Sequence, residues 1–360
     1  MAPNLAILAI ILVVYIANGE LMRAEAIDKV APFMVIWFAH SMGCVLLPLL
    51  TLHDIFWKPA AATRKTAAAA AVSWRSLGAT ALALAPLYAL LNWLLVRSYA
   101  ANAMAFTNTV FASNSCFTFA FSALIFNVRP TPLKMSAALL SLFGVALVGW
   151  ASPSRGIGGG GGDQYGGSAA LALSAAMLDA LYKVLMMRAM AGAPGGGGGG
   201  GDALSPSPSP RTALRYVGLL GAVHLFALWP VLFLLDWLDL EVFALPSAST
   251  VGVLCVIGAG SLLVATLAVL LLMRAGPIYI SVGMSLAIPL GYAADLLLPV
   301  HAGTHSVPKS GARGKTIVTA LGVLAVCGSV LLASRAGRSP RRGGARKVRH
   351  FYRESAASAV

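Results

Sequence analysis

Apolar residues run through this chain in ten long windows, separated by charged residues, prolines and glycine clusters. The windows lie at about 2–19, 32–52, 77–96, 103–126, 132–151, 168–190, 212–235, 248–273, 276–298 and 315–334. A helix needs about 20 apolar residues to cross the hydrocarbon core of a bilayer. The pattern therefore predicts ten transmembrane helices.

The composition excludes a soluble protein. Of the 360 residues, 58% are hydrophobic and only 11% are charged, and the mean hydropathy is +0.81. Soluble domains carry about 25% charged residues, so this chain has too few charges to cover a water-facing surface. The expected fold class is an all-α polytopic membrane protein.

Low-complexity segments indicate how the chain is divided. Glycine runs occur at 156–167 and 195–201, and a Ser-Pro repeat ends at Pro210. Such runs behave as tethers, and neither ends in the Gly-Lys-Ser/Thr of a phosphate-binding loop. We expect a five-helix unit at 1–151, a Gly-rich loop at 152–167, a second five-helix unit at 168–334 with an insert at 191–211, and a basic tail at 335–360.

Half of the net charge of +14 lies in that tail, where eight basic residues and Glu354 give +7. A basic segment directly after an apolar helix is typical of contact with anionic lipids on the cytoplasmic leaflet. We therefore expect the tail to contact anionic lipids and not to bind nucleic acid. The basic residues are Arg335, Arg338, Arg341, Arg342, Arg346, Lys347, Arg349 and Arg353.

The distribution of Lys and Arg predicts the orientation. With the N-terminus in the cytoplasm, the basic segments 53–75 and 188–215 and the tail share that side, and the acidic segment 236–241 lies opposite. One basic segment, 309–315, falls on the wrong side. The best fit is a multi-pass protein of an endomembrane or the plasma membrane with both termini cytoplasmic.

The two halves repeat one pattern. Residues 109–123 align with 281–295, which places Ser113 on Ser285, and residues 140–147 align with 324–331. Five spans per half is an odd number, so the second half enters the membrane inverted. Inverted repeats are the layout of many secondary carriers, whose sites lie near the midplane between the repeats.

Three stretches carry a resemblance to a known family. They are Tyr15-Ile-Ala-Asn18-Gly-Glu20-Leu, Asn108-Thr-Val-Phe-Ala-Ser113-Asn114-Ser115, and Ser285-Leu-Ala-Ile-Pro289-Leu followed by Ala294-Asp295. With the repeat, they resemble the EamA-like drug/metabolite transporter superfamily, and within it the F-type branch of solute carrier family thirty-five.

This resemblance implies ten helices, with the fifth and tenth peripheral and the others around a central cavity. It also implies alternating-access transport of small organic solutes, often without a bound metal. Two features depart from the family. Lys183 occupies a position that is usually apolar or small, and the lysine-containing ninth-helix signature of nucleotide-sugar carriers is absent, which argues against a nucleotide-sugar substrate.

Asp179 and Lys183 are the most informative ionisable residues. They lie four residues apart in the sixth window, so they share a helical face in the favourable acid-before-base order. Charges inside a membrane are costly and are functional by default. The pair either lines the cavity and contacts a substrate or proton, or serves only to neutralise its two charges for insertion.

Two further acids are candidates for coupling transport to an ion. Asp295 follows Pro289 and Gly291, which can loosen the ninth helix, and its repeat mate is the apolar Ala123. Glu20 lies at the end of the first window. For both acids, a solvated position at the helix end is the alternative interpretation.

The fourth window is unusually polar, with Asn108, Ser113, Asn114 and Ser115. Such side chains need partners in a dry environment, and they also join helices to one another. Helix packing and substrate binding remain equal alternatives. The family resemblance adds Asn92 and Ser285 as neighbours.

No sequence pattern indicates a cofactor or a metal. Cys44, Cys116, Cys255 and Cys327 all fall in apolar windows, and no His, Cys and Asp spacing suits zinc. His40 and His224 are isolated, and packing is their simpler interpretation. No hydrolase, metalloprotease or nucleotide-binding motif occurs, so we expect no enzyme.

The sequence therefore favours a secondary active transporter or exchanger of a small organic solute. A homodimer is compatible with this function. The alternative is a membrane scaffold or receptor-like protein that uses the same fold without transport.

Overall fold

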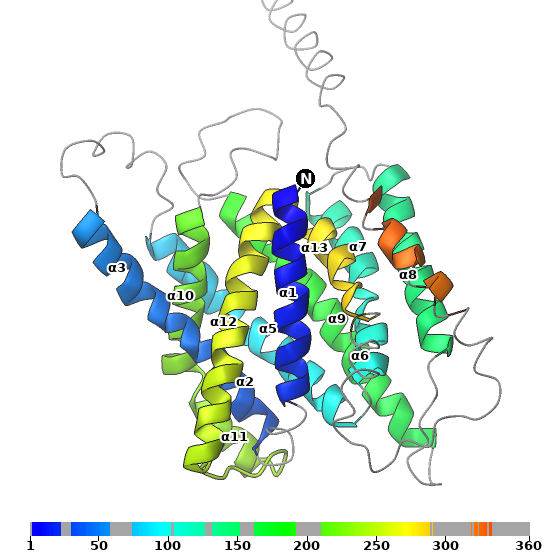
Figure 1. Cartoon of the computed structure of the whole chain (residues 1–360). Helices are drawn as coiled ribbons and strands as arrows, with labels where there is room; N and C mark the ends of the chain where they lie inside the picture. Colours follow the sequence, from blue (N-terminus) through cyan, green and yellow to red (C-terminus); the bar gives the residue numbers. More distant parts are fainter. Residues whose placement is uncertain are drawn as a thin grey trace, which may run out of the picture.

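The computed structural model describes residues 2–22, 30–57, 74–101, 104–126, 132–151, 162–191, 210–288, 290, 318, 320–322, 324–329 and 331–332. All of its elements in these ranges are helices (Figure 1). They are α1 (Ala2–Leu21), α2 (Pro32–Ser41), the 3₁₀ turn η2 (Met42–Val45), α3 (Leu46–Trp57), α5 (Trp74–Ala101), α6 (Met104–Phe111), α7 (Asn114–Phe126), α8 (Pro132–Ala151), α9 (Gly162–Ala191), α10 (Pro210–Ala227), α11 (Pro230–Trp237), α12 (Ala248–Ala275) and α13 (Pro277–Met284). The all-α prediction is confirmed for this part of the chain.

Five of the described helical segments are long and apolar enough to cross a membrane. They are Asn4–Leu21, Pro32–His53, Trp74–Tyr99, Ala170–Met190 and Ala248–Ala275. A sixth is added if α10 and α11, which meet at an angle of 50°, count as one span. The chain thus has the helices of a multi-pass membrane protein, whereas the ninth and tenth predicted spans lie only partly within the described residues.

Several windows that the sequence suggested as single helices are broken. The second window contains the 3₁₀ turn η2, the fourth breaks at a turn over Ala112 and Ser113, and the seventh breaks before Pro230. Proline lacks the N–H that would continue a helix, which accounts for the break before Pro230 in the seventh window. Breaks in membrane helices are tolerated where neighbouring protein groups satisfy the backbone.

Between α12 and α13 the chain reverses at a glycine. Gly276 has φ of +87°, in the region that favours glycine because a Cβ atom would be strained there. Its N–H donates to the Leu272 carbonyl at 2.8 Å and closes α12. Pro277 then begins α13, since its fixed φ and missing N–H suit a first helical turn.

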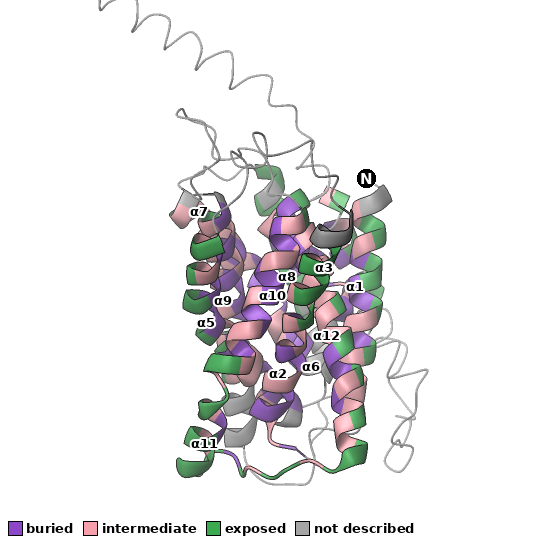
Figure 2. Ribbon diagram, turned by 90° about the vertical axis from the view of Figure 1, so that its left-hand side faces the viewer, coloured by how far each residue is buried: buried purple, intermediate pink, exposed green. Residues whose placement is uncertain are grey.

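The helices form a bundle whose largest core cluster draws residues from α1, α5, α9, α10, α12 and α13. The most extensive packing joins α5 to α9, followed equally by α1 to α12 and α7 to α9. In addition, α12 packs against α2, and α5 packs against α10. Figure 2 shows the buried positions on the inner helix faces, with many exposed ones outside. Large exposed apolar side chains include Val13, Leu82, Leu124, Phe143 and Val256, as lipid contact requires.

The turn η2 crosses α10 with almost no side-chain volume between them. A Cβ atom added to Gly221 would lie 2.4 Å from the Cys44 nitrogen, and one added to Gly43 would lie 2.9 Å from the Val217 carbonyl oxygen. Small residues of this kind let membrane helices approach closely. The contact fixes the second and seventh windows against each other.

Candidate functional site

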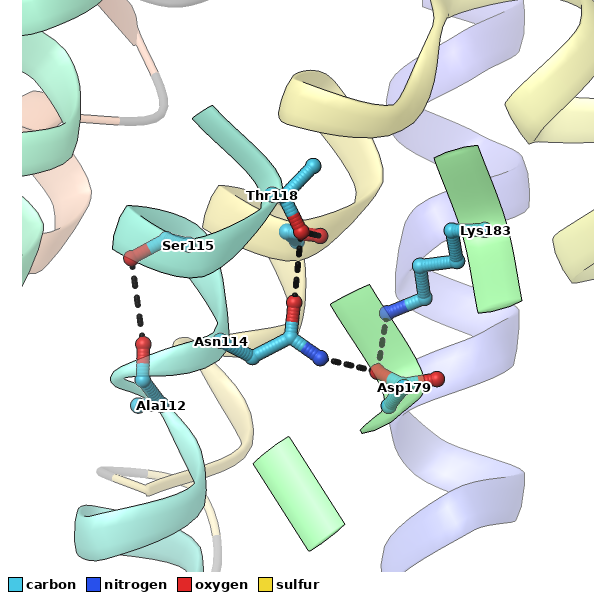
Figure 3. Close-up of polar contacts among 7 residues, drawn as sticks. Ala112, Asn114, Ser115, Thr118, Asp179 and Lys183 are labelled. Atoms are coloured by element: carbon cyan, nitrogen blue, oxygen red, sulfur yellow. Dashed lines mark hydrogen bonds and ion pairs between the residues drawn. The ribbon is translucent and has the colours of Figure 1, made fainter. Parts of the chain in front are cut away.

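The centre of the site is an ion pair on α9. The Lys183 amine donates to Asp179 Oδ2 at 2.5 Å, one helical turn apart. Their side chains are 13% and 10% exposed. Asp179 Oδ2 also accepts a hydrogen bond from the Asn114 amide of α7, as Figure 3 shows. The sequence pair thus exists, and its carboxylate additionally bonds to a second helix.

Asn114 connects this pair to two more helices. Its Oδ1 atom accepts from the Thr118 hydroxyl at 2.8 Å, and Thr118 lies 2.9 Å from the Ser281 hydroxyl on α13. Thr118 and Ser281 are both buried. A continuous chain of polar contacts therefore runs from Lys183 on α9 through α7 to α13.

A second polar group surrounds Asn108 on α6. Its Oδ1 atom accepts from the Tyr99 hydroxyl at 2.7 Å and from the Tyr15 hydroxyl at 3.4 Å. The two tyrosine hydroxyls lie 2.7 Å apart. The Asn108 amide nitrogen is buried and has no hydrogen-bond partner, which leaves two N–H donors of this side chain unused.

Ser285 lies where α13 ends. The Ser141 hydroxyl of α8 donates to Ser285 Oγ at 2.9 Å. Because Ser285 is the acceptor in that bond, its own proton remains available. Ser285 is 1% exposed.

Asn108, Asn114, Lys183 and Ser285 line one small cavity. Its volume is about 20 Å³, room for roughly one water molecule. The other lining residues are Tyr15, Phe111, Ala112, Ser281, Met284 and Ala287. The helix break at Ala112 and the end of α13 therefore meet at a cavity inside the bundle that polar and apolar side chains line together.

The remaining sequence candidates lie elsewhere or carry other contacts. Asn92 donates to the Tyr88 carbonyl of its own helix at 2.7 Å and does not line the cavity. Glu20 lies half-buried near the end of α1. The buried Ser113 Oγ has no partner, Ser115 donates to the Ala112 carbonyl at 3.0 Å, and Asp295 is outside the described residues.

His40 and His224, which the sequence suggested were packing residues, belong to an aromatic cluster. Their rings lie 5.3 Å apart, and the Tyr88 ring lies 4.6 Å from His40. Tyr88 also stacks on Tyr182 at 4.8 Å. Among the described residues no group of His, Cys, Asp or Glu could hold a metal ion.

Sequence reasoning did not identify Glu241 as a site residue. This carboxylate follows α11, and its side chain is 4% exposed. It accepts from the Phe33 backbone N–H at 2.9 Å and from the Trp93 indole at 2.5 Å. The guanidinium of Arg97 lies 3.8 Å away.

Glu241 thereby ties together three segments at one end of the bundle. They are the start of α2, the last part of α5 and the segment after α11, which lie at the lower edge of Figure 1. Arg97 also donates to the Leu240 carbonyl at 3.0 Å and lies over the Trp93 ring. We call this group of Phe33, Trp93, Arg97 and Glu241 the end clamp. Only the acidity of segment 236–241 hinted at it.

Comparison with known proteins finds a relative that is similar in sequence and a solved structure that is similar in fold. No family model matches. A stretch of 87 residues is 37% identical to an uncharacterized transporter of Schizosaccharomyces pombe, and the match spans 24% of this chain and about a quarter (26%) of that relative. A crystal structure matches over 94% of this chain and 98% of its own, with a TM-score of 0.57 and 15% identity, which establishes similarity of fold alone.

The apolar helices and this relative together support an integral, multi-pass, all-helical membrane protein related to transporters.

Proposed function

We propose that the protein is a secondary active transporter or exchanger that moves a small organic solute by alternating access. The observation that carries this proposal is the buried cavity, which is lined by an ionisable side chain and several polar ones and lies where two interrupted segments meet. Interrupted membrane helices with polar groups at the break are the usual binding elements of secondary carriers.

The proposal includes ten spans arranged as two inverted five-helix repeats of the EamA-like drug/metabolite transporter type. Helix contacts support it. If the nth span corresponds to the span five later, the packing of α1 with α12 is the mate of α5 with α9. The packing of α2 with α12 is then the mate of α10 with α5.

The interruptions support the same correspondence. The turn at Ala112 and Ser113 in the fourth span matches the turn at Ser285 and Leu286 in the ninth. The second and seventh spans are also both interrupted, at η2 and before Pro230, and they cross at Gly43 and Gly221.

In this proposal the end clamp keeps one side closed. Alternating access requires that side to open, so the contacts of Glu241 with α2 and α5 must break and re-form in each cycle. We further propose that the clamp faces away from the cytoplasm and that both termini are cytoplasmic. A cysteine introduced at the exposed Val242 should then react with an impermeant reagent from the non-cytoplasmic side.

Contact of the tail with anionic lipids and a homodimer remain parts of the proposal, as does the absence of enzymatic activity. The tail lies outside the described residues. Replacing Arg341, Arg342, Arg346 and Lys347 with Gln should change membrane targeting or lipid contact while transport continues, since each basic residue contributes about 1 kcal/mol of surface attraction.

Counterflow in liposomes tests the central proposal. Purified protein is reconstituted with an unlabelled mixture of amino acids, organic acids, amines and nucleosides inside, and uptake of each labelled compound is measured. We expect at least one to accumulate above protein-free liposomes. If none does with a folded protein, the scaffold or receptor-like alternative replaces the transporter.

A further inference from the structure

The cavity presents donors rather than acceptors. Asn108 lines it and has an amide nitrogen without a partner, and Ser285, which also lines it, retains a proton after accepting from Ser141. The Lys183 ammonium has three N–H groups and also lines it. A buried donor without an acceptor is costly, so a ligand that supplies an acceptor removes this cost and is bound more tightly.

The two amide oxygens of the lining asparagines already accept hydrogen bonds. Asn108 Oδ1 accepts from the two tyrosines, and Asn114 Oδ1 accepts from Thr118. Asp179 Oδ2 accepts from both Asn114 and Lys183. An N–H donor would compete with these existing bonds at the two amide oxygens, whereas an acceptor would find the unpartnered Asn108 N–H groups.

Of the two residues in the ion pair, the cation is the one that lines the cavity. Lys183 is a lining residue and Asp179 is not, and Figure 3 shows the lysine amine and the Asn114 amide both directed at one oxygen of the Asp179 carboxylate. A ligand in the cavity therefore contacts Lys183 rather than Asp179. A cationic ligand would be repelled before it reached the carboxylate.

We propose that this cavity recognises the carboxylate of a small organic monoanion, which binds Lys183, Asn108 and Ser285. This rests on the proposed function and names its substrate class. Lys183 is the single cation among the described lining residues, which suits one negative charge better than a phosphate dianion. The present volume has room for roughly one water molecule, so binding the carboxylate and the rest of the ligand requires the cavity to widen.

Matched pairs of ligands test the charge requirement without a known substrate. The probes are acetate, propionate and benzoate, each compared with its own amide, together with benzylamine and inorganic phosphate. The thermal unfolding midpoint of the purified full chain reports binding, since a ligand of the native state stabilises it by mass action. At least one carboxylate should raise the midpoint with an affinity about tenfold or more above that of its amide.

Two variants assign the effect to this cavity. In the double variant Asp179→Asn with Lys183→Gln, no unpaired charge remains and the carboxylate-to-amide ratio should fall to about one. Ser285→Ala should weaken carboxylate binding several-fold. Ser136→Ala is its matched control, because Ser136 lies exposed on α8 and donates to the Leu133 carbonyl, and it should change nothing.

The inference is overturned if no carboxylate of the panel stabilises the protein, if benzylamine or an amide stabilises it equally, or if the double variant keeps the preference. Counterflow of labelled compounds is scored separately. Carboxylate binding without counterflow would remove the transporter proposal and leave the site. Counterflow of other solutes without a preference for carboxylates would support the transporter proposal and overturn the carboxylate site.

Discussion

Asp179 and Glu241 are both buried carboxylates, but the structure holds them in different ways. Asp179 lies within α9 and bonds to the side chains of Asn114 and Lys183, both of which line the cavity. Glu241 lies in the segment after α11 and bonds to a backbone N–H and an indole from two other helices. Asp179 is therefore linked to the cavity, whereas Glu241 joins three separate segments at one end of the bundle.

The difference separates ligand recognition from closure. Lys183 can exchange part of its bonding from Asp179 to a ligand while both residues stay on α9, because it already lines the cavity. The bonds of Glu241 break only when α2, α5 and the segment after α11 separate. Substitutions at the two sites should therefore affect different steps of a transport cycle.

Breaking the central pair should have the largest effect. Asp179→Asn leaves the Lys183 ammonium buried without its counter-charge, and removal of one partner of a buried pair costs about 3–5 kcal/mol. We expect a loss of folded protein on expression, measured by size-exclusion profile and thermal unfolding. The double variant Asp179→Asn with Lys183→Met should restore folding.

Uptake by that double variant separates the two roles of the pair. We expect a folded protein without transport, because the donor at the cavity is gone. A double-mutant cycle in stability and in initial uptake rate provides the comparison. Recovery of transport together with folding would show that the pair only neutralises its charges.

The α9 pair could be predicted from sequence because its information is local. A spacing of four residues on an apolar helix fixes a shared face. The polarity of Asn108 and Asn114 similarly indicated a buried site, although it could not tell packing from binding. In the structure Asn114 bonds within the helix bundle through Thr118, which is the packing role, whereas the Asn108 nitrogen remains unpartnered, and its use in binding stays a proposal.

The end clamp could not be predicted because its partners are far apart in sequence. Glu241 contacts Phe33 and Trp93, which are 208 and 148 residues away. An acid next to a predicted span usually faces water, so nothing local distinguishes Glu241 from Asp239. The helix breaks were missed for a related reason, since the ten windows were defined by hydropathy and Ala112 and Ser113 do not interrupt it.

Substitutions where η2 crosses α10 test a third contact, in which backbone packing rather than a carboxylate joins the second window to the seventh. Gly221→Ala would place a Cβ atom 2.4 Å from the Cys44 nitrogen, and overpacking of this kind costs about 1–3 kcal/mol. We expect a lower unfolding midpoint. Gly252→Ala on α12 is the control, because its added Cβ meets nothing within 4 Å, and a similar loss there would contradict the steric explanation.

Weakening the end clamp should have an intermediate effect on stability and a specific effect on access. Glu241→Gln replaces one acceptor oxygen with an amide that opposes an existing donor, at a cost of about 1–3 kcal/mol. We expect a cysteine at the half-buried Phe38 to react faster with an impermeant maleimide in this variant. Asp236→Asn keeps an acceptor for the Phe243 N–H and should leave the labelling rate unchanged.

Carboxylate binding should survive in Glu241→Gln, because the cavity donors are untouched. Loss of binding together with faster labelling would mean that the clamp and the cavity form one unit, and the distinction between recognition and closure would fail.

Arg97 should have the smallest effect, although it is the cation of the clamp as Lys183 is the cation of the cavity. Its guanidinium lies 3.8 Å from Glu241 and its side chain is 37% exposed, so solvent and salt screen the pair, and such pairs contribute about 0–1 kcal/mol. Arg97→Gln should lower the unfolding midpoint slightly at low salt and by less at 0.5 M salt. Arg97→Lys keeps the charge and should recover the salt-dependent part, while the packing over Trp93 stays weakened. An effect of Arg97→Gln as large as that of Asp179→Asn would show that Glu241 depends on its cation as strongly as Asp179 does, and that the two carboxylates differ only in place.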